Sequence, residues 1–322
     1  MKHSGYLTTS GAEIYYEQYG SGTPLLILHG NSQSLSVFYP FLRTFLPYFQ
    51  VILMDSRGHG RSRLSVHTAL HGFSTEDMAD DVIALLDHLH LSSVHLLGFS
   101  DGANIGLEIA CKYPERLKTL ICISANASPD GLLTPLYLAA QMLHSILNLL
   151  LPVLKCSFSS ASASSGSSAV SALSNLESSL PFQKNFSVSA ASAVCANKER
   201  QHHFKSIFPR IPAEQRMCIP QSVFLCHRAK LPMAQKKKPD FLTRLTHRVL
   251  RRRNLTSLLL HSPRLSTRKL QTISVPVLLI AGTRDLIKPS PSRWLARQIP
   301  TSQLLLMTGG RHTSIFRTPA PY

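Results

Sequence analysis

Acidic residues are scarce in this sequence, and most of them lie in its first part. The 322 residues include 34 Lys and Arg but only 17 Asp and Glu, which gives a net charge of +17. Residues 1–130 carry 8 basic and 12 acidic side chains, whereas residues 131–322 carry 26 and 5. A strongly basic chain suggests a nucleic acid or an anionic membrane as partner. Because only the second part is basic, the total charge describes two unlike regions.

Charged residues of either sign make up only 16% of the chain, and hydrophobic residues make up 44%. This composition excludes wholesale disorder. At about 150 residues per domain, the length allows one large domain or two.

The six cysteines form no C-x-x-C pair and have no regular spacing. A metal cluster of Cys218, Cys226 and His227, or one that uses His202 and His203, would lack a four-ligand spacing. Reduced thiols in a cytoplasmic protein are therefore the favoured interpretation, and we expect no metal or cofactor.

One uncharged, leucine-rich run is long enough to span a membrane. No apolar run follows the charged start of the chain, so we expect no secretory signal. The uncharged run covers residues 131–154. Within it Gln141, His144, Ser145 and Asn148 recur at helical spacing and form a polar stripe. This stripe favours a soluble amphipathic helix over a core or cleft, so we expect no membrane span.

Short apolar runs alternate with helical patterns along most of the chain. Such alternation over short connections predicts an α/β fold with a mostly parallel sheet flanked by helices. The expected strands are residues 14–19, 24–28, 51–54, 94–97, 120–123, 276–280 and 303–307. The expected helices are residues 37–49, 74–89, 102–113, 241–259 and 292–299.

The alternation stops in the middle of the chain. Residues 157–171 contain nine serines, and residues 156–230 show no sustained period. Because such a composition buries little apolar surface, we predict disorder or a loose linker there. The basic runs 236–238 and 251–253 have few aromatic neighbours and belong to no nucleic-acid-reading motif. Nucleic acid is therefore an unlikely partner, although these runs can steer anionic substrates.

The sequence Gly98-Phe-Ser-Asp-Gly102 carries the strongest chemical signal. It follows the predicted strand 94–97 and opens a helix, which is the context of the G-x-S-x-G nucleophile elbow. The glycines permit a sharp turn that leaves Ser100 exposed at a helix N-terminus. A serine hydroxyl is a poor nucleophile unless a base removes its proton, and a histidine base must be held in one tautomer to do so. Asp285 and His312 follow two later predicted strands in the order that this elbow requires.

An oxyanion hole needs two backbone donors. One is the N–H of Asp101, directly after the proposed nucleophile. The other is expected from the loop after strand 24–28, where Gly30 permits a close approach and Asn31 supplies the N–H. We expect the Asp101 carboxylate to turn away from the hole.

Five segments resemble those of the α/β-hydrolases, in particular the esterase-like group. They are LLILHGN (25–31), DSRGHGRS (55–62), GFSDGANIGLEIA (98–110), PVLLIAGTRDLI (276–287) and GGRH (309–312). The resemblance implies a hydrolase core formed by residues 1–130 and 261–322, with a helical cap inserted at residues 131–260. It also implies an ester or similar acyl substrate and the triad Ser100, His312 and Asp285. We interpret DSRGHGRS as structural, with Arg57 bracing a turn that Gly58 and Gly60 permit.

The same resemblance covers acyltransferases, carbon–carbon bond hydrolases and cofactor-free peroxidases, which the elbow does not separate. Family caps are usually helical throughout, unlike residues 156–230, and family chains usually continue further beyond the histidine. Two alternatives therefore stay open. One is a catalytically silent hydrolase-like protein, with part of the cap read in a foreign frame, and the other is a polyanion-binding protein. Oligomeric state is not predicted.

Overall fold

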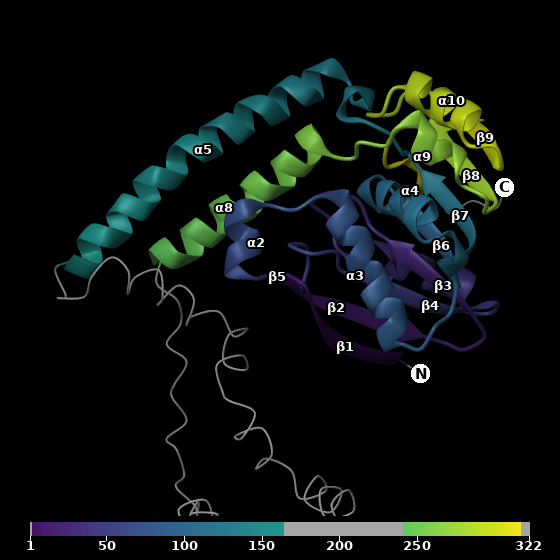
Figure 1. The fold of residues 1–322 in the computed structure, drawn as a ribbon, viewed down its shortest axis with the longest axis horizontal. Coiled ribbons are helices and arrows are strands. Elements are labelled where there is room, and N and C mark those ends of the chain that lie inside the picture. Colours follow the sequence, from purple (N-terminus) through teal and green to yellow (C-terminus); the bar gives the residue numbers. More distant parts are fainter. Residues whose placement is uncertain (1, 164–240, 317–322) are drawn as a thin grey trace, which may run out of the picture.

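A nine-stranded sheet lies at the centre of the computed structural model, which describes residues 2–163 and 241–316 (Figure 1). The strands follow one another across the sheet in the order β1–β2–β4–β3–β6–β7–β8–β9, and β5 pairs with β2. All neighbouring pairs from β4 to β9 are parallel, whereas β1, β2 and β5 pair antiparallel. The predicted α/β class with a mostly parallel sheet is confirmed. The strands are β1 (Lys2–Thr9), β2 (Ala12–Tyr19), β3 (Thr23–Leu28), β4 (Phe49–Met54), β5 (Arg63–Leu64), β6 (Val94–Phe99), β7 (Leu117–Ile123), β8 (Val277–Gly282) and β9 (Ser302–Met307).

Helices connect most of the parallel strands. The predicted start of α3 is confirmed, because Ser74 accepts from the Asp77 amide while the Asp77 carboxylate accepts from the Ser74 amide. Such a capping box satisfies two amides that the first helical turn leaves without partners. The α-helices are α1 (Leu42–Phe45), α2 (Val66–His71), α3 (Thr75–His88), α4 (Asp101–Lys112), α5 (Thr134–Ala163), α8 (Phe241–His261), α9 (Thr267–Gln271) and α10 (Pro289–Gln298).

Alternate residues of the central strands enter two separate cores. On β3, Leu26 and Leu28 join the cluster that contains the buried residues of α3 and α4, while Leu25 and Ile27 join a cluster on the other face. Successive side chains of a strand point to opposite faces, and both faces are covered here. This explains why the central strands read as continuous apolar runs.

Three expectations about local structure were wrong in part. The expected helix 37–49 is a 3₁₀-helix, Leu35–Phe41, followed by the single turn α1, because Pro40 and Pro47 lack the N–H that a longer α-helix needs. Strand β1 was not predicted, since it is a polar edge strand with most residues exposed. Residues 156–163 were predicted to lie outside regular structure but belong to α5, because extending a helix that has already begun costs little; the rest of the Ser-rich segment lies outside the described residues.

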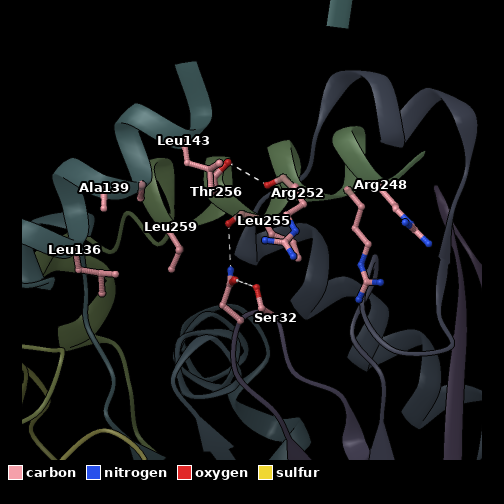
Figure 2. A pocket seen from close by; sticks show the side chains of 12 residues that line it. Ser32, Leu136, Ala139, Leu143, Arg248, Arg252, Leu255, Thr256 and Leu259 are labelled. Atoms are coloured by element: carbon pink, nitrogen blue, oxygen red, sulfur yellow. Dashed lines mark hydrogen bonds between the residues drawn. The ribbon is translucent and has the colours of Figure 1, made fainter. Parts of the chain in front are cut away.

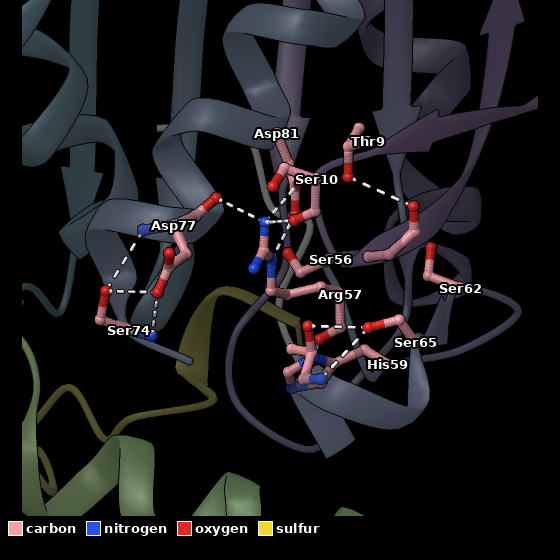
Figure 3. A network of polar contacts seen from close by, with 12 residues as sticks. Thr9, Ser10, Ser56, Arg57, His59, Ser62, Ser65, Ser74, Asp77 and Asp81 are labelled. Atoms are coloured by element: carbon pink, nitrogen blue, oxygen red, sulfur yellow. Dashed lines mark hydrogen bonds and ion pairs between the residues drawn. The ribbon is translucent and has the colours of Figure 1, made fainter. Parts of the chain in front are cut away.

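Arg57 braces the loop after β4, as predicted (Figure 3). Its guanidinium is buried and forms a two-point ion pair with Asp81 of α3, at 2.6 and 2.8 Å. The same group donates to the carbonyl of Asp77 at 2.9 Å. Gly58 and Gly60 have φ values of 72° and 49°, which fit the predicted tight turn. The loop is therefore fastened to α3.

Two long helices, α5 and α8, lie side by side over one end of the core, and we call them the cap helices (Figure 1). They are held together by a small apolar cluster that includes Leu147, Leu151, Val249 and Leu250. Within the described residues, the stretch Thr134–Pro152 of α5 is the one helix with the length and composition of a membrane span. A single such helix is weak evidence for a span; this one packs on α8, and 17% of the stretch is buried.

Candidate active site

The turn between β6 and α4 has the geometry of a nucleophile elbow. Ser100 adopts φ 55° and ψ −117°, a conformation that non-glycine residues rarely occupy. A Cβ on Gly98 would lie 2.3 Å from the Gly102 carbonyl oxygen, and one on Gly102 would lie 2.4 Å from that of Leu28. The two glycines thus let strand, turn and helix pack closely enough to hold the serine in this strained position.

The loop after β3 lies against this turn. A Cβ on Gly30 would lie 2.9 Å from the Ser100 Cβ, so only glycine fits there. The buried His29 holds this loop in place by donating from Nδ1 to the Gly30 carbonyl at 2.8 Å. Its Nε2 accepts from the Ser56 amide at 3.1 Å, and burial lowers the pKa of His29 to about 4. A neutral imidazole can make both hydrogen bonds at once.

Asp285 and His312 come from the loops after β8 and β9 and meet at the carboxyl ends of these strands. His312 Nδ1 donates to Asp285 Oδ1 at 2.6 Å. The Asp285 carboxylate is buried and also accepts from Ser124 Oγ at 2.5 Å and from the Ile287 amide at 3.1 Å. Burial acts to raise the pKa of Asp285, but the hydrogen bonds from His312 and Ser124 outweigh it, so the pKa is lowered. An ionised Asp285 fixes the ring with its proton on Nδ1.

The His312 ring lies beside the elbow. It contacts the Phe99 ring, directly before Ser100, with a centroid separation of 4.9 Å. Ser100 and His312 share no hydrogen bond in this structure, and His312 Nε2 has no partner among the described residues. Such catalytic hydrogen bonds are often long in a free enzyme and tighten when substrate binds.

Two backbone amides beside the elbow have no acceptor among the described residues. One belongs to Asn31 in the loop after β3, and the other belongs to Asp101 at the start of α4. The Asp101 carboxylate is buried and accepts from Asn31 Nδ2 at 2.9 Å. Asn31 Nδ2 also donates to the Leu255 carbonyl on α8 at 3.1 Å. Burial raises the pKa of Asp101 to about 6, although the Asn31 hydrogen bond and the nearby His312 act to lower it.

The side-chain bridge from Asn31 to Asp101 and Leu255 was not predicted, nor were the roles of His29 and Ser124. His29 could have been suspected, because it ends a buried strand within a quoted motif. Ser124 follows β7 directly and has φ 57°, but no sequence pattern marks it.

Within the part of the chain that the structure describes, no three His, Cys, Asp or Glu side chains are grouped so that they could hold a metal ion. The sequence candidates for a metal cluster, between residues 202 and 227, lie outside the described residues.

Comparisons with known proteins place the chain in a family. The family model described as the alpha/beta hydrolase fold matches residues 23–319. A protein of Azorhizobium caulinodans, provisionally named carbamate hydrolase RutD, is 33% identical over 128 residues, which are 40% of this chain and 47% of that protein. The uncharacterised hydrolase YraK of Bacillus subtilis is 31% identical over 119 residues, which are 37% of this chain and 43% of that protein. The matched region thus spans about half the length of these curated relatives.

Solved structures show the same fold. The enol-lactonase of Burkholderia xenovorans aligns with a TM-score of 0.56 at 17% identity and covers 97% of this chain and 95% of its own. A thermophilic esterase of Thermogutta terrifontis aligns with a TM-score of 0.54 at 21% identity and covers 98% and 93%. The family match and the observed sheet agree with each other: this chain belongs to the α/β hydrolase fold family.

Proposed function

We propose that this protein is a serine hydrolase that cleaves an ester or a related acyl bond. The observation that carries the proposal is the 2.6 Å hydrogen bond between His312 and the buried Asp285, with the His312 ring beside the elbow that presents Ser100. The hydrolase and esterase names among the similar proteins support it. No cofactor is needed for this chemistry.

In the proposed mechanism, Ser100 Oγ attacks the acyl carbon while His312 Nε2 accepts its proton. Asp285 stabilises the imidazolium that forms, because it accepts a hydrogen bond from the Nδ1–H group and stays ionised. The amides of Asn31 and Asp101 donate to the developing oxyanion. His312 then returns the proton to the leaving group, and a water molecule activated by His312 hydrolyses the acyl-enzyme.

We further propose that residues 131–260 form a cap inserted into a core of residues 1–130 and 261–322. The two described helices of this region, α5 and α8, lie between β7 and β8 in the chain and over the end of the sheet (Figure 1).

A cytoplasmic location is proposed from the unpaired thiols of Cys111 and Cys122.

Turnover of 4-nitrophenyl acetate by the purified protein tests this function. The Ser100→Ala variant is expected to reduce kcat/KM about 10³-fold or more. The exposed Ser92→Ala variant is a matched control that should keep full activity. If wild-type protein melts cooperatively but shows no turnover above that of Ser100→Ala, the catalytically silent alternative holds instead.

A further inference from the structure

A cavity of about 660 Å³ lies between the cap helices and the loop after β3 (Figure 2). Asn31 and Ser32 contribute to it from the loop, and α5 and α8 contribute the other lining residues. Asn31 ties this cavity to the proposed catalytic centre, since its side chain bonds both Asp101, next to Ser100, and the Leu255 carbonyl on α8. A molecule in the cavity therefore reaches the loop that supplies an oxyanion amide.

The cavity has one apolar wall and one basic wall. The labelled side chains of α5 lie on one side of it, and the labelled arginines of α8 lie on the other (Figure 2). The apolar lining consists of Leu136, Ala139, Ala140, Leu143, Leu255 and Leu259. The basic lining consists of Arg248, Arg251 and Arg252, which occupy little more than one turn of α8.

No carboxylate neutralises these arginines in the described structure. Neither cap helix contains an Asp or Glu anywhere in its sequence. None of the ion pairs among the described residues involves Arg248, Arg251 or Arg252, whereas the neighbouring Arg253 donates to the Leu70 carbonyl at 2.9 Å. Three guanidinium groups beside an apolar surface attract an anion more strongly than they would in open solvent.

Resting on the proposed hydrolase function, we propose that the substrate is an anionic amphiphile. Its negatively charged group binds Arg248, Arg251 and Arg252, its aliphatic part lies against the α5 wall, and its acyl bond reaches the elbow. Guanidinium groups bind carboxylate and phosphate groups through paired hydrogen bonds, so both anions fit this chemistry. The cap would thus select for charge and the core would supply the reaction.

The first test compares two esters of similar size, the anionic 4-nitrophenyl hemiglutarate and the neutral 4-nitrophenyl valerate. Wild-type protein is expected to favour the anionic ester in kcat/KM. The Arg252→Gln variant should reduce the anionic-to-neutral ratio about tenfold, in line with the loss of a charged hydrogen bond. Arg268→Gln, an exposed arginine on α9 outside the cavity, is the matched control and should leave the ratio unchanged. An ester bearing a phosphonate in place of the carboxylate shows which anion is preferred.

The second test is independent of turnover and measures binding of octanoate and octanol by calorimetry. Octanoate is expected to bind at least tenfold more tightly than octanol, and this advantage should shrink with added salt and in Arg252→Gln. Equal affinity for the two probes, or an anionic-to-neutral ester ratio that Arg252→Gln leaves unchanged, overturns the anionic-substrate proposal. Tight octanoate binding without any ester turnover would support the anion-binding site of the cap and contradict the hydrolase function instead.

Discussion

The charged side chains of the sheet core and those of the cap helices differ in whether they have a partner of opposite charge. In the core, the buried Glu17 pairs with Arg61 at 2.9 Å and with Lys2 at 3.0 Å, and it accepts hydrogen bonds from Tyr15 and Tyr19. Burial acts to raise the pKa of Glu17, but the hydrogen bonds outweigh it and lower the pKa to about 2. The stabilisation that ionised Glu17 gives to the folded state is present above the ordinary pKa of a glutamate and is lost as the pH falls towards 2.

On α8, by contrast, Arg248, Arg251 and Arg252 line a cavity and have no carboxylate partner among the described residues. A paired buried charge constrains the fold, whereas an unpaired charge at a cavity is free to bind a ligand. Folding thus depends on the paired charges of the core, and under the proposal above the unpaired charges of the cap set the specificity.

The largest effect is expected where the core tolerates no added atom. A Cβ in Gly102→Ala would lie 2.4 Å from the Leu28 carbonyl oxygen, so β3 and α4 would have to separate. We expect a loss of stability of about 4–5 kcal/mol or more, enough to leave little folded protein in a circular dichroism melt. The control Gly22→Ala meets only an atom 3.8 Å away and should cost about 1–2 kcal/mol, from its positive φ. Equal losses in the two variants would contradict this account of the elbow.

The second effect compares a paired with an unpaired arginine. Arg57→Met leaves the carboxylate of Asp81 buried without its cation, and we expect the free energy of unfolding to fall by about 3–5 kcal/mol. Arg252→Met on the cap should change it by less than about 0.5 kcal/mol. Urea unfolding measures both. If Arg252→Met destabilised the protein as much as Arg57→Met, the distinction between core and cap charges would be lost.

The third effect concerns the acidic side chain at the proposed oxyanion hole. Burial raises the pKa of Asp101 to about 6, so its charge appears as the pH rises through 6 and opposes an oxyanion nearby. Asp101→Asn keeps an acceptor for Asn31 but removes the charge. The ratio of variant to wild-type kcat/KM should be near 1 at pH 5 and rise to about tenfold above pH 7.

The same substitution predicts a change in stability. Because the folded pKa of Asp101 lies above its ordinary value, the protonated carboxyl favours the folded state. This contribution to the free energy of unfolding is fully present below about pH 4 and is lost as the pH rises through 6. At pH 8, Asp101→Asn should therefore be roughly 2–3 kcal/mol more stable than wild type. A kcat/KM ratio that stays flat with pH, together with unchanged stability, would show that the charge of Asp101 opposes neither the oxyanion nor folding.

The smallest effect is expected at the contact between the cap helices. Leu147 is buried against α8, and Leu147→Ala should weaken this contact by about 2 kcal/mol. Hydrogen exchange of the α8 amides should then accelerate about 30-fold, while the melting temperature of the core stays within a few degrees. Leu138→Ala removes a side chain that is 52% exposed on the same helix and should change neither quantity. A cooperative loss of the core in Leu147→Ala would mean that cap and core unfold as one unit.

The central strands and the order of the site residues could be predicted from the sequence for a physical reason. Strands buried on both faces read as continuous apolar runs, and loops at their carboxyl ends carry Ser100, Asp285 and His312 in the family order. Strand β1 escaped prediction because an exposed edge carries no apolar pattern. The 3₁₀-helix Leu35–Phe41 was read as α-helical because its apolar spacing resembles that of a longer helix.

The cavity between the cap helices could not be predicted. It brings residues 136–143 against residues 248–259, more than 100 positions away, and no local pattern encodes such a pairing. The Asn31 to Asp101 bridge was missed for a similar reason, because it depends on how two loops from different strands meet.

Labelling with a fluorophosphonate followed by mass spectrometry tests the central claim most directly. The activated serine hydroxyl should form one covalent adduct per folded molecule, on Ser100, and the His312→Gln variant should react at least about 100-fold more slowly because it lacks the base. The exposed His71→Gln variant should react at the wild-type rate. A wild-type protein that melts cooperatively yet forms no adduct at Ser100 would contradict the account.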